Sequence, residues 1–232
     1  MIDQKTDVPA AEIAARLTEA GARWPVVRSG WPLIGGCLAA AAAAAWAGVS
    51  SLAVGAGIGA LFFLWFFRNP ERTAPSGDQF IISPADGKVM EIESCRDDRF
   101  LQREMIRLGI FMSPVDVHVN RMPCAGKVAA IHYFPGRYLM AFNPKASLEN
   151  EHQVMIVDAD RGAKLLVVQI AGFLARRIET WVRPGDHLPR GERFGMIRLG
   201  SKVDLYLPPS TAIRVKIGDR VKAGESVVGV WS

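Results

Sequence analysis

The longest apolar pattern in the chain covers residues 29–67, a stretch of 39 residues without Asp, Glu, Lys, Arg or His. One membrane-spanning helix needs about 20 apolar residues. The stretch is therefore long enough for two short helices joined by a turn at residues 48–51, Gly-Val-Ser-Ser. One long tilted helix and a hairpin that enters only one leaflet are the alternatives. A cleaved signal peptide fits less well, because the stretch is too long and begins too late.

Positive charges flank this stretch on both sides. Arg23 and Arg28 precede it, and Arg68 and Arg72 follow it. Because positive residues favour the cytoplasmic side of a membrane, we expect both ends to stay there, as a hairpin would arrange them. The protein would then lie at the cytoplasmic face of the cell membrane. Residues 1–28 would form a cytoplasmic segment, either a short Ala-rich amphipathic helix or a disordered stretch.

After a linker at residues 68–78, the pattern changes to short strand-like runs separated by turn residues. No run in residues 79–232 has the length of a convincing helix. We therefore predict an all-β sandwich or barrel for this catalytic domain. The expected strands cover residues 80–82, 88–92, 106–112, 126–133, 153–157, 164–170, 176–182, 195–199, 203–207 and 212–217.

Two turns in this region share one pattern, Gly-Asp followed after four residues by Gly-Glu. They begin at Gly185 and Gly218, and a weaker echo, Gly-Lys-Val, begins at Gly87 and Gly126. Turns of this kind are similar to those of biotinyl and lipoyl domains. The predicted fold class is therefore mainly β, with a lipoyl/biotinyl-like hammerhead β-barrel core of two related halves. An N-terminal membrane-embedded helical hairpin precedes it.

The composition narrows the choice of partners and of compartment. The net charge is +5, which suits nucleic acid or an anionic membrane surface. No nucleic-acid-binding signature is present, and the apolar stretch favours the membrane. The three cysteines, Cys37, Cys95 and Cys124, form no closely spaced pair, which argues against a disulfide framework or a zinc site and fits a reducing compartment.

A Gly-Ser pair, Gly200–Ser201, lies inside a strand-like run near the C-terminus. Gly in a strand usually marks a bulge or a close backbone approach. A chemical interpretation is also open, because Gly tolerates strained backbone that holds its carbonyl open to attack by the Ser201 hydroxyl. That attack would turn the amide into an ester. β-Elimination and hydrolysis would then leave an N-terminal pyruvoyl group at position 201.

Four motifs, in this order along the chain, resemble those of the phosphatidylserine decarboxylases. Trp-Phe-Phe-Arg-Asn-Pro-Glu-Arg stands at 65–72, Ser-Pro-Ala-Asp-Gly-Lys-Val at 83–89 and Met-Ser-Pro-Val-Asp-Val-His at 112–118. Leu-Gly-Ser at 199–201 resembles the family's processing site. The resemblance extends from about Trp31 to the end of the chain, and the short length is similar to the compact bacterial branch.

The resemblance implies self-cleavage between residues 200 and 201 into a large chain, 1–200, and a paired small chain, 201–232. The covalent pyruvoyl cofactor derived from Ser201 would form a Schiff base with the amine of phosphatidylserine. It would withdraw electrons as CO2 leaves, the role of pyridoxal phosphate in other decarboxylases, and phosphatidylethanolamine would be released. No motif for pyridoxal phosphate or a metal is present. The oligomeric state stays open, a homodimer included.

The resemblance also implies an Asp and a His that activate Ser201. Asp86 occupies the matching Ala-Asp-Gly position, although a turn Asp before Gly is its ordinary use. Many bacterial relatives read Asp-x-His-x-x-His-Met-Pro, whereas here His118 is kept and Arg121 replaces the second His. Arg cannot serve as a base at ordinary pH, so the base would be His118 or another residue. Arg121 would instead bind the phosphate or carboxylate of the lipid.

The sequence alone does not decide where His118, Arg121 and His152 point. His118 and Arg121 have opposite parity in a strand, so both face one site only if the strand bulges or ends there. His152 follows Asn150 and Glu151, where relatives carry Asn-Glu-Arg. It would orient the substrate or lie on the surface.

The rival interpretation is a membrane-tethered lipoyl/biotinyl-like carrier or adaptor domain without catalysis. A carrier needs a swinging Lys with particular neighbours at a hairpin tip, and Lys88 lacks them. Adaptors of this kind carry long coiled-coil arms, and the chain has no sustained heptads. A denaturing gel separates the classes, because the enzyme would run as two chains and either rival as one.

Overall fold

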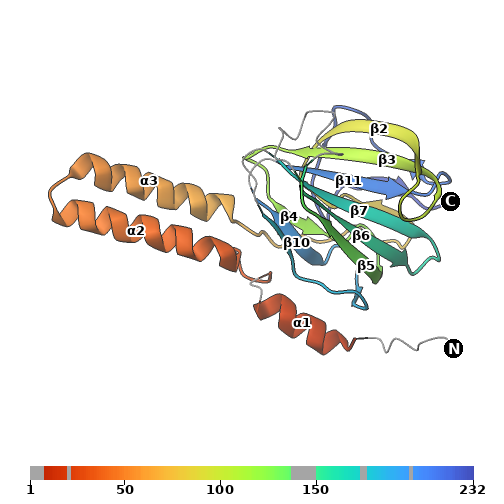
Figure 1. Ribbon diagram of the computed structural model, residues 1–232, viewed down its shortest axis with the longest axis horizontal. Helices are drawn as coiled ribbons and strands as arrows, with labels where there is room; N and C mark the ends of the chain where they lie inside the picture. Colours follow the sequence, from red (N-terminus) through yellow and green to blue (C-terminus); the bar gives the residue numbers. More distant parts are fainter. Residues whose placement is uncertain (1–7, 20–21, 137–149, 173–176, 199–200) are drawn as a thin grey trace.

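The computed structural model describes residues 8–19, 22–136, 150–172, 177–198 and 201–232. It confirms a mainly β protein with N-terminal helices (Figure 1). The β strands form one compact unit, and two long helices project from one end of it. The hammerhead arrangement in particular remains a prediction.

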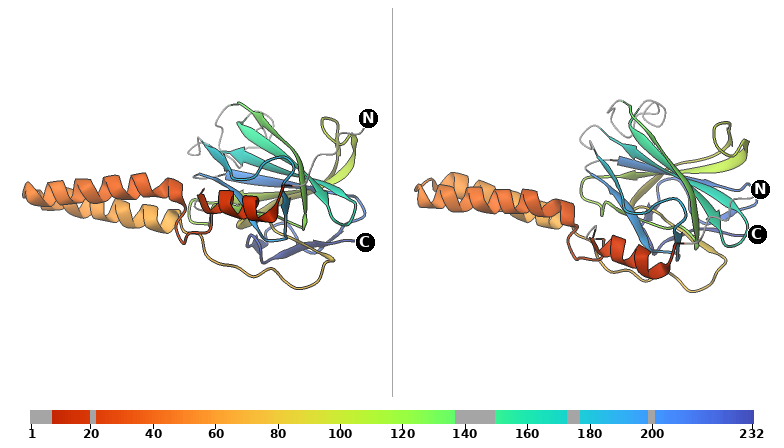
Figure 2. Two further views of the ribbon diagram at one scale, coloured as in Figure 1. Left: turned by 90° about the horizontal axis from the view of Figure 1, so that it is seen from below. Right: turned by 60° about the horizontal axis from the view of Figure 1, so that its bottom comes forward.

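The projecting helices are α2 (Trp31–Trp46) and α3 (Ser50–Phe66), which run antiparallel as a hairpin (Figures 1 and 2). Alanine and other small residues without charge make them good helix formers in an apolar medium. The chain reverses at Gly48, whose φ of 75° suits glycine after a helix end. At 1.5 Å per residue, arms of 16 and 17 residues are about 24–26 Å long.

The hairpin exposes apolar side chains all round. Trp46 near its tip is 93% exposed, and Leu52, Ile58 and Leu61 are each at least 60% exposed. The helical segment Arg28–Trp46 is long and apolar enough to cross a membrane by length and composition, while Ser50–Phe66 is shorter. So large an apolar surface is unfavourable in water and needs a covering.

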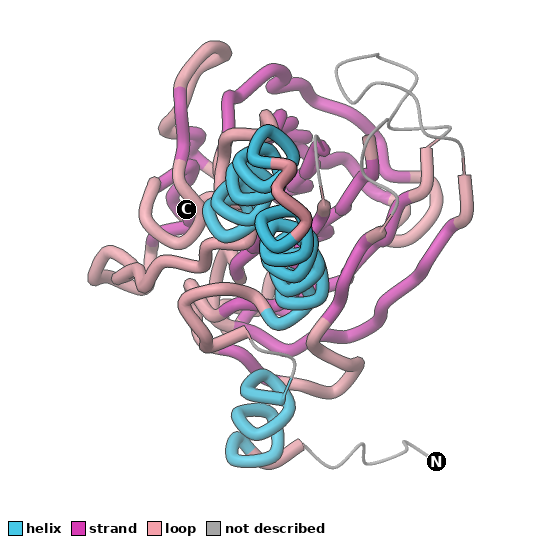
Figure 3. Tube along the Cα trace, turned by 90° about the vertical axis from the view of Figure 1, so that its left-hand side faces the viewer, coloured by secondary structure: helices cyan, strands magenta, loops and turns pink. Residues whose placement is uncertain are grey.

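Helix α1 (Ala10–Glu19) packs on the β unit beside the base of the hairpin (Figure 3). Ile13 and Leu17, one turn apart, are buried, so the amphipathic pattern is used to dock the helix. Arg16 adds an ion pair of 2.8 Å to the fully buried carboxylate of Asp186. The sequence allowed either a short amphipathic helix or a disordered stretch in this segment, and the structure has the helix.

The described strands of the β unit form one eight-stranded sheet and two three-stranded sheets, and all their pairs are antiparallel. The strand orders are β13-β2-β3-β11-β7-β6-β5-β9, β1-β14-β12 and β4-β10-β8. The bounds are β1 Phe80–Ile82, β2 Gly87–Asp97, β3 Arg103–Met112, β4 Val119–Arg121, β5 Gly126–Phe134, β6 His152–Ala159, β7 Lys164–Ala171, β8 Ile178–Thr180, β9 His187–Leu188, β10 Arg193–Ile197, β11 Ser201–Leu207, β12 Ala212–Ile213, β13 Arg220–Val221 and β14 Val227–Val230.

Strand β11 shows how the large sheet divides its two faces. Val203, Leu205 and Leu207 point into the main core, as the alternation predicts. Lys202 and Asp204 point to the other face, where both are nearly fully buried and 3.1 Å apart in an ion pair. A second, smaller apolar cluster lies on that outer face.

The repeated sequence pattern corresponds to repeated structure. Gly185 and Gly218 have φ near 100°, and their N–H groups donate to the carbonyls of Val128 and Val89, both at 2.8 Å. Each Gly-Asp turn is thus hydrogen-bonded to a strand that begins with one of the two Gly-Lys-Val motifs. This supports two related halves in the β unit.

The segment expected as a linker is tied to the β unit at its start. Asn69 is 2% exposed and donates to the carbonyls of Ala22 and Trp24 at 2.6 and 3.0 Å. Arg193 of β10 donates to Asn69 Oδ1 at 2.9 Å and to Glu71 at 2.7 Å. The Arg-Asn-Pro-Glu-Arg motif therefore joins the hairpin to the β unit as well as linking them in sequence.

Candidate active site

Ser201 begins β11 at the end of the large sheet that faces the hairpin (Figure 1). Its register partners are Met112, the last residue of β3, and Ala171, the last residue of β7. The side chain is fully buried on the core face, and its hydroxyl lies 3.4 Å from the thioether sulfur of Met112. Gly200, the other half of the expected cleavage site, lies outside the described residues.

His118 lies between β3 and β4 and is fully buried. Its Nδ1 lies 2.9 Å from the carbonyl oxygen of Asp116. Because a carbonyl only accepts, Nδ1 carries the proton and Nε2 has a lone pair. Nε2 is buried without a hydrogen-bond partner among the described residues. Burial lowers the pKa of His118 to about 4, against the opposing effect of Asp116, so the ring is neutral at pH 7 and able to accept a proton.

The base of the hairpin is built into this site. The ring centroid of Phe66, the last residue of α3, lies 4.5 Å from that of His118. Arg68 donates to the carbonyl of Val115 at 2.8 Å. The loop that carries His118 is thereby fixed to the point where the apolar helices enter the β unit.

Asp86 is held by Arg72 rather than by His118. Both carboxylate oxygens accept from the Arg72 guanidinium, the Nη2–Oδ2 contact at 2.8 Å, and Oδ1 also accepts from the Ala223 N–H at 2.8 Å. Burial alone would lower the pKa of Arg72, but the pair with Asp86 raises it. In this structure the group that orients His118 is a backbone carbonyl. The negative charge of Asp86 still acts to raise the pKa of His118.

The match to a known protein family covers the residues of this site. The family model described as "Phosphatidylserine decarboxylase" matches residues 60–229, a range that contains Arg72, Asp86, His118 and Ser201. The chain belongs to the phosphatidylserine decarboxylase family. This match confirms the resemblance that the four sequence motifs indicated.

Relatives match over most of their length. The phosphatidylserine decarboxylase proenzyme of Geobacter metallireducens is 43% identical over 211 residues, 89% of this chain and 96% of the relative. That of Symbiobacterium thermophilum is 44% identical over 208 residues, with the same shares. That of Syntrophus aciditrophicus is 48% identical over 171 residues, 74% of this chain and 80% of the relative.

Sequence reasoning missed a chain of buried amides next to Ser201 in this member of the decarboxylase family. Asn120 lies 3.8 Å from the Met112 sulfur and accepts from Gln169 at 2.8 Å. Gln153 donates to Gln169 at 3.1 Å and to Thr180 at 2.5 Å. The signal was present in Gln169, a polar residue at an inward position of an otherwise apolar strand.

Arg121 has its guanidinium in hydrogen bonds inside the fold. It donates to the carbonyls of Gly191 and Pro70 at 2.9 and 2.8 Å. Burial, together with the charges of Arg193 and Arg72, lowers its pKa to about 10, so it stays charged at pH 7. These contacts favour a structural role over the substrate-binding role expected from sequence.

His152 lies on the opposite face of the sheet from Ser201. It pairs with Ile170, which pairs with Lys202, whereas Ser201 pairs with Ala171. Paired residues share a face and successive residues alternate. Its ring stacks on Phe134 at 4.9 Å, and Nδ1 lies 2.7 Å from the Asn150 carbonyl oxygen. It is buried in the outer cluster and is not a surface residue.

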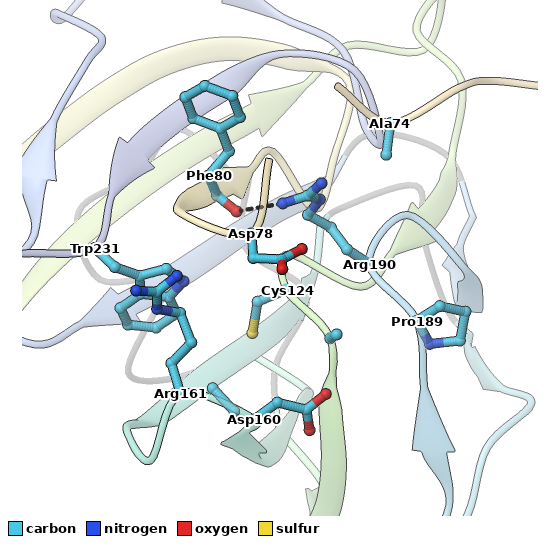
Figure 4. A pocket seen from close by; sticks show the side chains of 11 residues that line it. Ala74, Asp78, Phe80, Cys124, Asp160, Arg161, Pro189, Arg190 and Trp231 are labelled. Carbon is cyan, nitrogen blue, oxygen red and sulfur yellow. Dashed lines mark hydrogen bonds between the residues drawn. The ribbon is translucent and has the colours of Figure 1, made fainter. Parts of the chain in front are cut away.

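A hollow of about 550 Å³ lies elsewhere, lined by Asp78, Cys124, Asp160 and Arg190 among others (Figure 4). Neither Ser201 nor His118 lines it. Burial raises the pKa of Cys124 to about 12, which keeps the thiol protonated, and Arg190 donates to the Phe80 carbonyl at 3.1 Å. Its residues stabilise the fold, and size alone does not mark the site of chemistry.

Proposed function

We propose that this protein is a self-processing phosphatidylserine decarboxylase that converts phosphatidylserine to phosphatidylethanolamine and CO2. The observation that supports it most is the buried Ser201 at the hairpin end of the sheet, in a family member whose neutral His118 has an Nε2 without a partner among the described residues. The rival, a carrier or adaptor, has no use for either group.

Self-cleavage would begin with attack of Ser201 Oγ on the carbonyl carbon of Gly200, with His118 Nε2 as the base that receives the hydroxyl proton. The C–N bond breaks and an ester forms. β-Elimination then breaks the Cβ–O bond, so that Gly200 leaves as a carboxylate and dehydroalanine remains at 201. Water adds to it and ammonia departs, which leaves the pyruvoyl group. One water is consumed and one ammonia released.

The pyruvoyl group would supply a carbonyl that captures the serine amine and an adjacent amide that withdraws electrons as CO2 leaves. The surroundings of Ser201 suit a small uncharged group, because its hydroxyl contacts a thioether and lies fully buried. The residues around Ser201 would hold this group in position and exclude water from it. Lys202, 2.8 Å from Glu91, anchors the first peptide of the small chain.

Asp86 would act through charge. Its pair with Arg72 fixes the carboxylate at one place in the site, where it makes His118 a better proton acceptor. His118 would be the base of processing, and Asp86 the acidic residue whose negative charge assists it. Arg121 and His152 are not carried forward as substrate ligands, because their hydrogen bonds and burial lie within the fold.

The hairpin would insert from the cytoplasmic side into an anionic membrane and bring the site to the lipid. Its arms of about 24–26 Å are shorter than a hydrocarbon core of about 30 Å, so entry from one side is favoured over two full spans. The large and small chains would stay together, because β11 lies between β3 and β7. The duplicated turns support a lipoyl-like core of two halves.

The test is conversion of phosphatidylserine by purified protein in detergent, followed by product analysis and a denaturing gel. The proposal expects phosphatidylethanolamine and two chains from the wild type. Ser201→Ala should give one chain and no product, since Ala has neither nucleophile nor leaving oxygen. A single full-length chain from the wild type without product would favour the carrier or adaptor.

A further inference from the structure

A basic hollow of about 470 Å³ lies at the base of the hairpin, and neither Ser201 nor His118 is among its lining residues. Its walls come from the residues just before α2, from β8 and from Arg198, which directly follows β10. Figure 1 shows β10 beside the base of the hairpin. Among the described residues, three arginines line it, Arg28, Arg177 and Arg198, together with one carboxylate, Glu179.

The charges leave an excess of two positive groups. Arg198 is paired with Glu179, its Nε 2.9 Å from Oε1. Arg28 and Arg177 are exposed, and Arg28 donates to a backbone carbonyl, that of Glu19, at 2.9 Å, which leaves its charge uncompensated. Ser29 is also a lining residue, and its hydroxyl oxygen is buried and has no hydrogen-bond partner in the described part of the chain.

Aromatic side chains mark the level of the hollow relative to a membrane. Trp24 and Trp31, on either side of Arg28 and Ser29, are 47% and 45% exposed. Trp65, on the other arm, is 42% exposed and stacks under the Arg68 guanidinium at 4.1 Å. Trp and Arg gather at the headgroup level of membranes. With the hairpin inserted, the hollow therefore lies among lipid headgroups.

We propose that this hollow binds the phosphodiester of an anionic glycerophospholipid, as a docking site separate from the reaction site. The inference depends on the membrane insertion proposed above. Arg28 and Arg177 would offer paired N–H donors to phosphate oxygens, which suits the planar guanidinium better than an ammonium. The Ser29 hydroxyl, which has no partner among the described residues, would donate to a third oxygen once its side chain turns toward the hollow. The ligand is a lipid, because the hollow opens beside the apolar hairpin.

The test measures vesicle binding by full-length Ser201→Ala protein, which does not turn lipid over. Phosphatidylcholine vesicles are compared with vesicles that also contain phosphatidylglycerol. The double variant Arg28→Gln/Arg177→Gln should bind the anionic vesicles about 25-fold more weakly, roughly fivefold for each arginine. Its binding to phosphatidylcholine, which reports mainly on the hairpin, should fall less than twofold, because the choline charge offsets that of the phosphodiester.

Two further variants separate the hollow from general attraction. Arg99→Gln/Arg161→Gln removes the same charge from exposed turns at the far ends of β2–β3 and β6–β7, and should weaken binding less than twofold. Arg28→Lys/Arg177→Lys keeps the charge but loses the paired N–H donors of the guanidinium. This variant should lose an intermediate amount of affinity for the anionic vesicles. Wild-type affinity of the Lys variant, or equal losses for the two Gln variants, would overturn the site.

The outcome is distinguishable from failure of the proposed reaction. Because Ser201→Ala cannot process, the binding result does not depend on the pyruvoyl group. If no form of the protein bound vesicles while the wild type still decarboxylated detergent-dispersed lipid, the docking site would be refuted and the reaction would stand. If the binding pattern held and no decarboxylation occurred, the reverse would follow.

Discussion

Phe66 and His118 are in ring contact, with centroids 4.5 Å apart and planes inclined at 41°. One residue ends the second hairpin helix and the other is the candidate base of the site. The contact helps to keep the imidazole dry and therefore neutral. The element that would enter the membrane thus also contributes to the burial that lowers the pKa of His118.

The first prediction concerns pH. With a pKa of about 4, His118 should remain an active base far below the pH at which an ordinary histidine is protonated. Self-cleavage of newly synthesised chain, followed on gels, should be constant from pH 7 to about 5 and fall about tenfold per unit below 4. The unfolded chain takes up this proton near pH 6.5, so stability also falls between pH 6.5 and 4. Circular dichroism at each pH checks that the chain is folded.

His118→Ala gives the matched control for that profile. Loss of a general base should slow cleavage by about 10²–10⁴-fold and remove the acid limb. Normal cleavage with loss of decarboxylation would assign His118 to the substrate instead. Wild-type rates for both steps would show that another residue is the base.

A second prediction tests the role of Phe66. Phe66→Leu should admit water to the imidazole, so the pKa of His118 rises toward 6.5 and the acid limb moves to higher pH. Trp46, which is 93% exposed at the far end of the hairpin, supplies the control Trp46→Leu, which should leave the profile unchanged. An unmoved acid limb in a folded Phe66→Leu protein would separate the hairpin from the chemistry.

The third prediction addresses Arg72 and Asp86. Both side chains are nearly buried, so Arg72→Gln should cost about 3 kcal/mol of stability and slow cleavage, and Asp86→Asn should do the same. The double variant should lose less than the sum. Arg96→Gln, which breaks the exposed pair with Asp98, should change neither. Chemical unfolding and gel time courses measure the two effects, and additive losses would contradict a direct pair.

These results show what local sequence can and cannot predict. The uncharged stretch, the strand alternation and the repeated Gly-Asp turns are local patterns, and the hairpin, the large sheet and the duplicated turns match them. The pair Arg72–Asp86 joins parts of the chain that only the fold brings together. Strand β2 runs to Asp97, five residues beyond the expected end, because β3 continues to pair with it as far as Arg103.

The role of a polar residue was the least predictable property. Arg121 looked like a substrate ligand because it replaces a histidine, but carbonyls from residues 70 and 191 take up its N–H groups. His152 was expected either to orient the substrate or to lie on the surface; its buried place on the outer face could not be predicted, because parity in β6 becomes meaningful only once its register with β7 is known. Ser201 could be found because its chemistry depends on adjacent residues.

A fourth prediction separates anchoring from processing. Val27 and Phe67 are joined by a backbone hydrogen bond of 2.9 Å, so the two ends of the hairpin lie together. Replacing residues 33–64 by a short Gly-Ser linker should leave self-cleavage intact and greatly weaken vesicle binding, with some low-salt binding to anionic vesicles retained. Removal of residues 1–72 is a poorer test, since it also removes Arg72. A folded but uncleaved deletion variant would contradict the separation.

The most direct measurement is the intact mass of purified wild-type protein, beside Ser201→Ala. The account predicts a large chain that ends at Gly200 and a small chain of 32 residues, lighter by one ammonia than the same peptide with an N-terminal serine. The small chain should resist N-terminal sequencing and be trapped by borohydride with phosphatidylserine. A single full-length chain with a free N-terminus and no reactive carbonyl, still able to decarboxylate the lipid, would contradict it.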